Sequence, residues 1–381
     1  MTIDFSKIPT PCYLIEEELL RSNLRLIKSV KEEAGVDIIL AFKGFSMWKV
    51  FPIVSEYISG AAASGAYEAR LSVDEMKTLA HTYSPAFQHS DFNVVMENSS
   101  HITFNSLSQL ERFLPDVNNF SRKISVGIRV NPEFSEVETE LYNPCTPGTR
   151  LGILAEQLGE ELPDGVEGFH FHTLCESSAL DLEKTLAAFE AKFGKYLNRI
   201  KWVNMGGGHL MTKKGYDTEK LIKILKEFRQ RYNGIEVILE PGSAFVWETG
   251  ILVAEIVDIV ENKGVKTAIL NVSFTAHMPD CLEMPYKPRI RGAYHEPVKG
   301  KPTYRMGGNS CLAGDFVGFW SFDHELETGE CIIFEDMIHY TIVKSSMFNG
   351  VPHPSIGMWC ENGEFKLLRE FDYGDYKGRM A

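Results

Sequence analysis

The chain has 381 residues, of which 44% are hydrophobic and 24% charged, with 24 Phe and 14 Tyr. At roughly 100 to 200 residues per domain, this length and aromatic content predict a folded chain of two or three domains and exclude a disordered one. Acidic side chains (52) outnumber basic ones (39), and no Lys/Arg cluster forms the basic face that a phosphate backbone requires, so we expect no nucleic-acid partner.

The sequence also lacks membrane and export signals. No run approaches the roughly 18 uncharged apolar residues of a membrane helix, and the first residues lack the basic start and apolar stretch of a signal peptide. The 7 cysteines are an odd number without a Cys-x-x-Cys pair. That is typical of a reducing compartment in a chain too large to need disulfides. We therefore expect a cytoplasmic protein with no membrane partner.

Short apolar runs alternate with amphipathic stretches of helical length over roughly the first 240 residues. The predicted strands are 36–42, 58–63, 79–83, 101–104, 124–130, 168–172, 202–205 and 235–239. The clearest predicted helices are 16–33, 67–79, 182–197 and 218–232. This alternation is typical of a (β/α)8 barrel, with an open doubly wound sheet as the alternative.

The pattern changes after about Trp247. Strand-like runs at 251–260, 267–272, 330–334, 339–343 and 365–368 follow one another with Gly and Pro between them. We predict an N-terminal barrel over residues 15–245, and a β-rich domain that combines residues 1–14 with 246–381.

The first predicted strand ends in Ala41-Phe42-Lys43-Gly44, which places a lysine in apolar company. Barrel enzymes carry their catalytic groups at the C-terminal ends of strands. Desolvation lowers the pKa of a lysine amine and suits it to Schiff-base chemistry, whereas a solvated lysine after a strand is the ordinary alternative.

The last two predicted strands of the barrel also end in chemically suggestive motifs. Gly206, Gly207 and Gly208 let the backbone approach an anion closely and present N–H groups to it, which suits a phosphate. Glu240 in Glu-Pro-Gly stands at the next strand end, where it could keep the nitrogen of a bound pyridine ring protonated. A plain flexible loop and a surface acidic turn are the alternatives.

Alternation along the sixth predicted strand puts His170 and His172 on the same side. Two histidines without a third ligand at motif spacing leave zinc as a minor alternative, and we predict no metal. One histidine could stack on a planar cofactor, and the other could be a core residue.

A Gly-rich loop in the β-rich part carries Cys311 and Asp315, four residues apart. They could supply a proton donor and a carboxylate for a cationic group, whereas a buried structural cysteine is the alternative.

Together these motifs make the whole chain similar to the fold-type III decarboxylases that depend on pyridoxal phosphate, the family of ornithine, arginine and diaminopimelate decarboxylases. Within the family, it most resembles the branch that acts on the carboxylated polyamines carboxynorspermidine and carboxyspermidine. The stretches that carry this resemblance are 40–45, 81–87, 141–145, 202–209, 276–280 and 338–344.

The resemblance implies a barrel, a C-terminal β-domain, pyridoxal phosphate as cofactor, and a homodimer with active sites between its subunits. Lys43 matches the lysine that binds the cofactor, and His172 matches the histidine that stacks on its ring. The other implied cofactor contacts are Gly206, Gly207 and Gly208 at the phosphate, Glu240 at the ring nitrogen, Arg129 at the hydroxyl side and Tyr340 at the phosphate.

The resemblance also implies roles on the substrate side. Cys311 would protonate the carbon that loses CO2, and Asp315 would hold the distal amine of the substrate. His277 and Asp280 stand where relatives carry substrate-binding residues, and Glu240 is expected to contact the substrate as well.

Several departures from the family pattern bear on the substrate. Ser243 replaces an arginine common in relatives, and Leu312 and Ala313 replace the Glu-Ser of diaminopimelate decarboxylases. These changes favour a polyamine over a substrate whose far end is an amino acid. The alternatives are a decarboxylase of diaminopimelate, ornithine, lysine or arginine, an alanine racemase, and a non-catalytic cofactor-binding protein.

Overall fold

The computed structural model describes residues 3–381, which form two compact units. One unit is Asn23–Phe245, and the other joins the described residues up to Ser22 with Val246–Ala381. Helix α1 (Glu17–Ala34) belongs to both units because it starts directly after the first strand of the second unit. The first boundary therefore lies within α1, whereas the sequence-based division placed it after residue 14.

The Asn23–Phe245 unit is built on a parallel sheet in the order β2-β10-β9-β8-β7-β6-β5-β4-β3. Only Ile39 separates β2 (Asp37–Ile38) from β3 (Leu40–Ala41), so the order returns to the strand where it began. The sheet is therefore an eight-stranded barrel, which confirms the predicted fold. Its other strands are β4 (Ala61–Ala63), β5 (Ala80–Tyr83), β6 (Ser99–Phe104), β7 (Ser125–Arg129), β8 (Val166–His170), β9 (Trp202–Asn204) and β10 (Glu236–Leu239).

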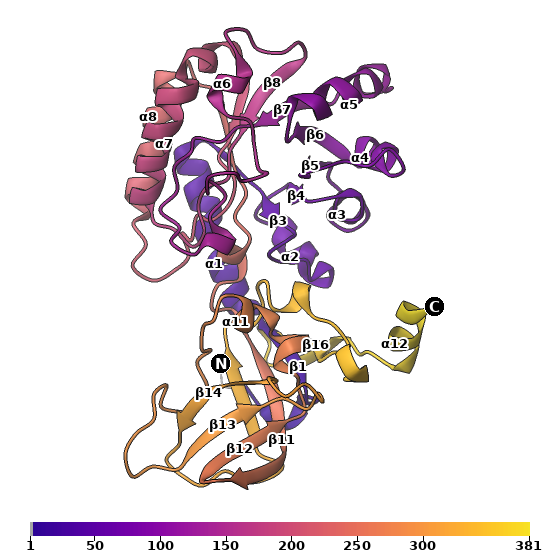
Figure 1. The fold of residues 1–381 in the computed structure, drawn as a ribbon, viewed down its shortest axis with the longest axis vertical. Helices are drawn as coiled ribbons and strands as arrows, with labels where there is room; N and C mark the ends of the chain where they lie inside the picture. The colour runs from indigo at the N-terminus through magenta and orange to yellow at the C-terminus, as the bar shows by residue number, and fades with distance from the viewer. Residues whose placement is uncertain (1–2) are drawn as a thin grey trace. The chain divides into compact units, whose positions relative to one another are not determined.

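Helices surround the barrel strands in Figure 1. Helix α8 illustrates why the sequence folds this way. Asp217 caps its first turn, and Leu221, Ile224, Leu225 and Phe228 recur at helical spacing and are buried. The helices of this unit, besides part of α1, are α2 (Phe51–Ser55), α3 (Ala66–Leu71), α4 (Phe92–Asn98), α5 (Leu107–Asn119), α6 (Ala155–Leu158), α7 (Ala179–Phe193), α8 (Thr218–Arg231) and α9 (Ser243–Val246).

Trp202 fills part of the barrel interior, and its indole ring requires glycine at two positions on neighbouring strands. A Cβ atom added at Gly127 or Gly168 would lie 2.2 Å or 2.0 Å from the Trp202 ring. Glycine on the two strands β7 and β8 therefore leaves the space that the indole occupies.

The second unit is built on an eight-stranded mixed sheet in the order β14-β13-β12-β11-β1-β16-β17, with β15 paired to β11. Its first strand pairs antiparallel with β11 and parallel with β16. The strands are β1 (Cys12–Glu16), β11 (Gly250–Asn262), β12 (Val265–Leu270), β13 (Thr303–Gly307), β14 (Phe316–Ser321), β15 (Cys331–Glu335), β16 (Ser355–Trp359) and β17 (Phe365–Arg369). Short helices α10 (Phe274–His277), α11 (Pro279–Glu283) and α12 (Tyr373–Met380) complete it.

Two predicted elements differ from the structure. The strand predicted at 339–343 is wrong: Tyr340 has a φ of 48°, outside the β region, and Ile342–Lys344 form a 3-10 turn. The helix predicted at 67–79 ends earlier, because α3 passes into a π-turn over Ser72–Met76 and Lys77 is left-handed with a φ of 58°.

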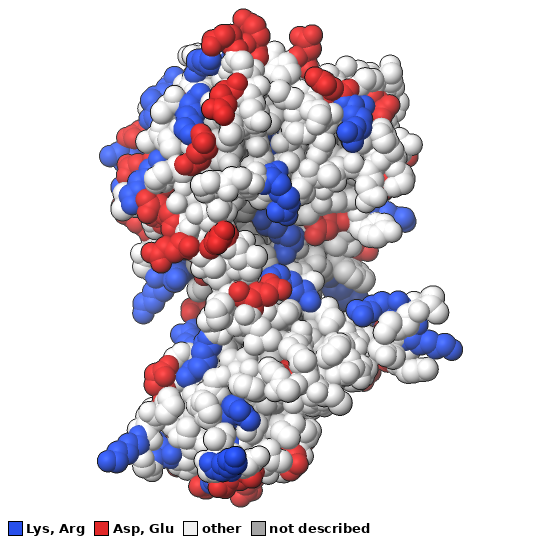
Figure 2. Space-filling view, viewed as in Figure 1, with Lys and Arg blue, Asp and Glu red and all other residues white. Residues whose placement is uncertain are grey.

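Acidic and basic side chains are interspersed on the face shown in Figure 2. Among residues 3–381, no helix is both long and apolar enough to cross a bilayer.

Candidate active site

Four predicted side chains come from the same end of the barrel. Lys43 follows β3, Arg129 ends β7, His172 follows β8, and Glu240 follows β10. Because all barrel strands are parallel, their carboxyl ends meet at one rim, where barrel enzymes carry out their chemistry. The structure thus brings these predicted residues together in one unit.

Lys43 lies beside His172. The distance between Lys43 Nζ and His172 Nε2 is 3.1 Å. The surrounding protein and the nearby charge of Arg129 lower the pKa of the Lys43 amine. The side chain is nevertheless exposed, so the amine is both accessible and more often neutral than an ordinary lysine. These are the properties of a nucleophilic lysine.

His172 is held on its other side by the glycine turn. The backbone N–H of Gly207 donates to His172 Nδ1 at 3.1 Å. Burial and the charges of Lys43 and Arg129 hold the pKa of His172 well below its usual value, so the ring is neutral. Since Nδ1 accepts, the proton of the neutral ring lies on Nε2, which faces Lys43. His172 therefore has a fixed tautomer and orientation.

The glycine turn needs glycine at each position. A Cβ atom at Gly206, Gly207 or Gly208 would lie 2.6 Å, 2.5 Å or 2.2 Å from a backbone carbonyl oxygen. Gly206 and Gly208 also have φ values of 68° and 89°. Within residues 3–381, the N–H groups of Gly208 and His209 donate to no protein acceptor. Such a turn has donors left for a phosphate.

Glu240 receives contacts from the two preceding strands. Asn204 Nδ2 donates to Glu240 Oε1 at 2.6 Å, and His170 Nε2 lies 3.6 Å from Oε2. Burial alone raises the pKa of the Glu240 carboxyl, but the contacts with His170 and Asn204 outweigh it, and the pKa lies below the usual value. The carboxylate is therefore ionised at neutral pH.

Arg129 is buried against Tyr83. Its guanidinium lies 4.8 Å from the centroid of the Tyr83 ring, and Nη2 donates to the His172 carbonyl at 3.1 Å. The Tyr83 hydroxyl donates to Asn105 Oδ1 at 2.8 Å. Asn105 thus supports the tyrosine that packs on the arginine.

These residues fit pyridoxal phosphate. The barrel rim offers an accessible amine of lowered pKa, a neutral imidazole, an ionised carboxylate and a glycine turn with free N–H groups. They match the aldehyde, ring face, ring nitrogen and phosphate of the cofactor, respectively.

Asp315 is buried and bonded to two segments of the β-rich unit. Its carboxylate accepts from Phe274 N at 2.7 Å, Thr275 N at 3.1 Å, Ser310 N at 3.1 Å and Ser310 Oγ at 2.6 Å. The residue is only 5% exposed. Four donors within the protein thus contact this carboxylate, and substrate binding by Asp315 stays a prediction. Asp315 ties the Cys311 loop to the start of α10.

Asp280 and His277 lie near that loop connection, in α11 and α10. Asp280 Oδ2 accepts from Tyr286 at 2.7 Å and from Thr341 at 2.9 Å, which brings the segment of Tyr340 to the same place. His277 Nδ1 accepts from Ser273 N at 3.1 Å, and burial lowers the pKa of His277 to about 4. His277 is thus neutral, and substrate binding by either residue stays a prediction.

Cys311 is an exposed thiol in the loop that Asp315 holds. Its backbone N–H donates to Asn349 Oδ1 at 3.0 Å. An exposed thiol on an anchored loop can donate a proton, and this role also stays a prediction.

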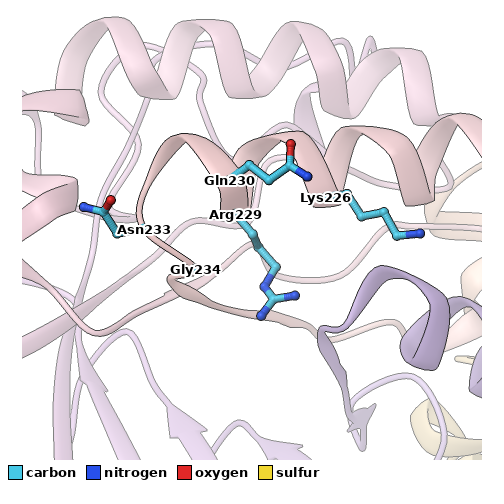
Figure 3. Close-up of a pocket in the computed structure, with 5 residues that line it drawn as sticks. All are labelled: Lys226, Arg229, Gln230, Asn233 and Gly234. Carbon is cyan, nitrogen blue, oxygen red and sulfur yellow. The ribbon is translucent and has the colours of Figure 1, made fainter.

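A metal centre and a surface pocket are two further candidate sites. Within the part of the chain that the structure describes, no cluster of three or more His, Cys, Asp and Glu could hold a metal ion. Figure 3 shows a surface pocket lined by Lys226, Arg229, Gln230, Asn233 and Gly234. It lies where α8 leads into the start of β10, at the opposite end of that strand from Glu240. In a barrel this end serves stability, so the pocket is not the active site.

Sequence reasoning missed Asn204, Tyr83 and Asn105, whose roles depend on neighbours from other strands. A polar residue near the end of an apolar run, two positions before the glycine triplet, was the available signal for Asn204.

A family model described as pyridoxal-dependent decarboxylase, C-terminal sheet domain, matches residues 12–338. The chain is 48% identical to carboxyaminopropylagmatine decarboxylase of Synechocystis sp., covering 99% of this chain and 96% of the relative. It is 44% identical to carboxynorspermidine/carboxyspermidine decarboxylase of Campylobacter jejuni, covering 98% and 99%.

A solved structure of carboxynorspermidine decarboxylase from Campylobacter jejuni, in complex with norspermidine, superposes with a TM-score of 0.91 at 43% identity. It covers 98% of this chain and 100% of the other. These similarities confirm the resemblance, the fold and the cofactor predicted from the sequence. The chain belongs to the pyridoxal-dependent decarboxylases, carboxy-lyases that use pyridoxal phosphate.

Proposed function

We propose that this decarboxylase acts on carboxynorspermidine or carboxyspermidine and releases norspermidine or spermidine. The bond between the α-carbon and the carboxylate breaks, CO2 leaves, and a proton takes its place on that carbon. The observation that carries the proposal is the barrel rim of Lys43, His172 and Glu240, in a chain that is 44% identical to an enzyme of that name over nearly its full length.

Each residue of the barrel rim has its own role in this proposal. When bound, pyridoxal phosphate supplies an electron sink for the pair left by the departing CO2. Lys43 would hold the cofactor covalently through its accessible amine. Glu240 keeps a proton on the ring nitrogen, and His172 supports the ring face. Arg129, Tyr340 and the turn Gly206, Gly207 and Gly208 bind the periphery of the cofactor.

Three side chains act on the substrate in this proposal. Cys311 would give the incoming proton to the carbon that has lost CO2. Asp280 and His277 would lie along the distal part of the substrate, and Asp315 positions the loop of Cys311.

A second candidate substrate is carboxyaminopropylagmatine. It is favoured by the 48% identity to the Synechocystis enzyme of that name. This compound ends in a guanidinium, whereas the two carboxylated polyamines end in an amine. The candidates therefore share the reacting end and differ in the distal cation.

CO2 release by the holoenzyme at equal substrate concentrations tests the proposal. We compare carboxynorspermidine, carboxyspermidine and carboxyaminopropylagmatine with diaminopimelate, ornithine, lysine and arginine. The highest kcat/KM is expected for carboxynorspermidine or carboxyspermidine. A clear preference for the guanidinium compound would select the second candidate, and a preference for an amino acid would overturn both.

Replacing Cys311 with alanine should leave cofactor binding unchanged and lower kcat by at least about 100-fold, the scale of general acid catalysis. In D2O, the parent enzyme should place deuterium on one face of the product carbon, and the variant on both. NMR of the product measures this. An unchanged rate with unchanged stereochemistry would remove Cys311 as the acid.

We further propose a cytoplasmic homodimer whose partner subunits share their active sites. Leu312, Phe316 and Phe319, beside Cys311, are 47%, 39% and 38% exposed, which supports a partner surface at this loop. All seven cysteines are free thiols, which supports a reducing compartment. Sedimentation of the holoenzyme should give twice the mass of the chain, and a monomer would contradict the dimer.

A further inference from the structure

Three successive barrel strands contribute to the surroundings of one carboxylate. His170 ends β8, Asn204 ends β9, and Glu240 directly follows β10. His170 pairs in register with Asn204, and Asn204 pairs with Ile238, two residues before Glu240. The parallel register thus places a histidine, an amide and the carboxylate side by side at the rim.

The side chains of Asn204 and His170 lie next to different oxygens of the Glu240 carboxylate. Asn204 Nδ2 lies 2.6 Å from Oε1, and His170 Nε2 lies 3.6 Å from Oε2. The longer contact exceeds a direct hydrogen bond and is electrostatic. Asn204 has its own orientation fixed, because its Oδ1 accepts from Gly206 N at 2.9 Å. The carboxylate plane is therefore set by two side chains that are themselves held.

His170 is buried and has little freedom. It is 3% exposed, and its ring packs 5.2 Å from the Tyr83 ring, centroid to centroid. Burial lowers the pKa of His170, so the ring is neutral at neutral pH and offers one N–H. Nε2 is the ring nitrogen that lies near the Glu240 carboxylate, so we assign the N–H of the neutral ring to Nε2.

An ionised carboxylate inside a barrel is costly unless donors and charges compensate for its burial. Other titratable groups act on Glu240 or on His170 as well. They are Lys43 after β3, His81 on β5, His101 on β6 and Arg129 on β7. Among the side chains named here, His170 and Asn204 are the two that lie against the Glu240 carboxylate.

We propose that His170 and Asn204 are positioning residues for Glu240: they aim its carboxylate and keep it ionised, so that it can hold the proton on the ring nitrogen of pyridoxal phosphate. The proposal rests on the proposed role of Glu240. The proposal gives a role to His170, which the sequence alone could not distinguish from a core histidine, and to Asn204.

The test uses the resting holoenzyme, and its readout is the acid-side midpoint of the pH titration of cofactor absorbance. His170→Leu keeps most of the volume and removes the N–H. Without the N–H dipole that faces the carboxylate, burial raises the Glu240 pKa, so the midpoint should move to higher pH by about one unit, a tenfold change in proton affinity. The acid limb of kcat should move with it, and kcat should fall about 10- to 100-fold with KM little changed.

His170→Gln restores an N–H donor and should return the midpoint most of the way to that of the parent. Asn204→Asp is a second, isosteric variant. It keeps an oxygen for Gly206 N but faces Glu240 with a second carboxylate, so it should shift the midpoint further than His170→Leu. This variant keeps the test valid if His170→Leu does not fold.

Phe169→Leu is the matched control. Phe169 is adjacent on β8 and fully buried, but its ring packs on Phe193 and Tyr196. It should lower the melting temperature without moving the midpoint. A folded His170→Leu or Asn204→Asp holoenzyme with the midpoint of the parent would overturn the proposal. Because no substrate is added, this result is independent of the substrate assignment.

Discussion

Lys43→Ala is expected to abolish the absorbance of covalently held cofactor and to lower CO2 release by at least about 1,000-fold. The reason is that Lys43 combines accessibility with a lowered amine pKa, caused by desolvation by the surrounding barrel residues and by the charge of Arg129. Among residues 3–381, no other lysine lies within hydrogen-bond distance of the neutral imidazole of His172. Absorbance spectra and CO2 release measured on the same preparation provide the test.

Lys49→Ala is the control for this prediction. Lys49 is also exposed and lies six positions further along the chain, in a 3-10 turn. It should retain the spectrum and the rate of the parent. A coloured and active Lys43→Ala protein would remove Lys43 from the centre of the mechanism.

Glu240→Gln should lower kcat by about 100-fold or more while leaving the fold intact, because it replaces an ionised partner of the ring nitrogen with a neutral isostere. The Glu240 pKa lies below its usual value despite burial. The parent therefore keeps the carboxylate charge at neutral pH and loses it only as the pH falls through the pKa. The rate of the parent should accordingly decline on the acid side. In Glu240→Gln, this dependence should disappear from the acid limb.

Glu236→Gln is the matched control, since Glu236 begins the same strand, β10, and its side chain is exposed. Its kcat and pH profile should coincide with those of the parent. Measuring kcat across the acid range for the parent and both variants tests this prediction. If Glu240→Gln retained full activity, the ring nitrogen would have another partner.

The barrel was predictable because its signal is local. Each strand is a short apolar run, and each major helix has its own buried stripe, as α8 shows with Leu221, Leu225 and Phe228. The segment 339–343 misled the same reasoning. Its apolar and β-branched residues favour a strand, but the left-handed Tyr340 breaks the extended backbone.

The active site was predictable only as far as strand ends and motifs reach. Lys43 and Glu240 were identified because each directly follows a predicted apolar run, and His172 because it ends such a run and matches the family motif. Asn204 and His170 could not be assigned this way, because their contacts with Glu240 depend on the register between neighbouring strands.

Asp315 shows what a motif leaves open. Its spacing from Cys311 suggested a substrate contact, yet its carboxylate is satisfied by donors on the segments of Phe274 and Ser310. A motif gives the residue type and the loop, but it does not give the hydrogen-bond partners that already occupy the side chain. Which side chains bind the distal end of the substrate stays a prediction for Asp280 and His277.

The most direct test of the central claim is borohydride reduction of the holoenzyme, followed by peptide mass spectrometry, with and without a competing substrate. Reduction makes the bond between pyridoxal phosphate and its lysine permanent. We expect the label on the peptide of Lys43, and strong protection of that lysine by prior addition of carboxynorspermidine or carboxyspermidine but not by diaminopimelate. A label on another lysine, or protection by the amino acid alone, would contradict the account.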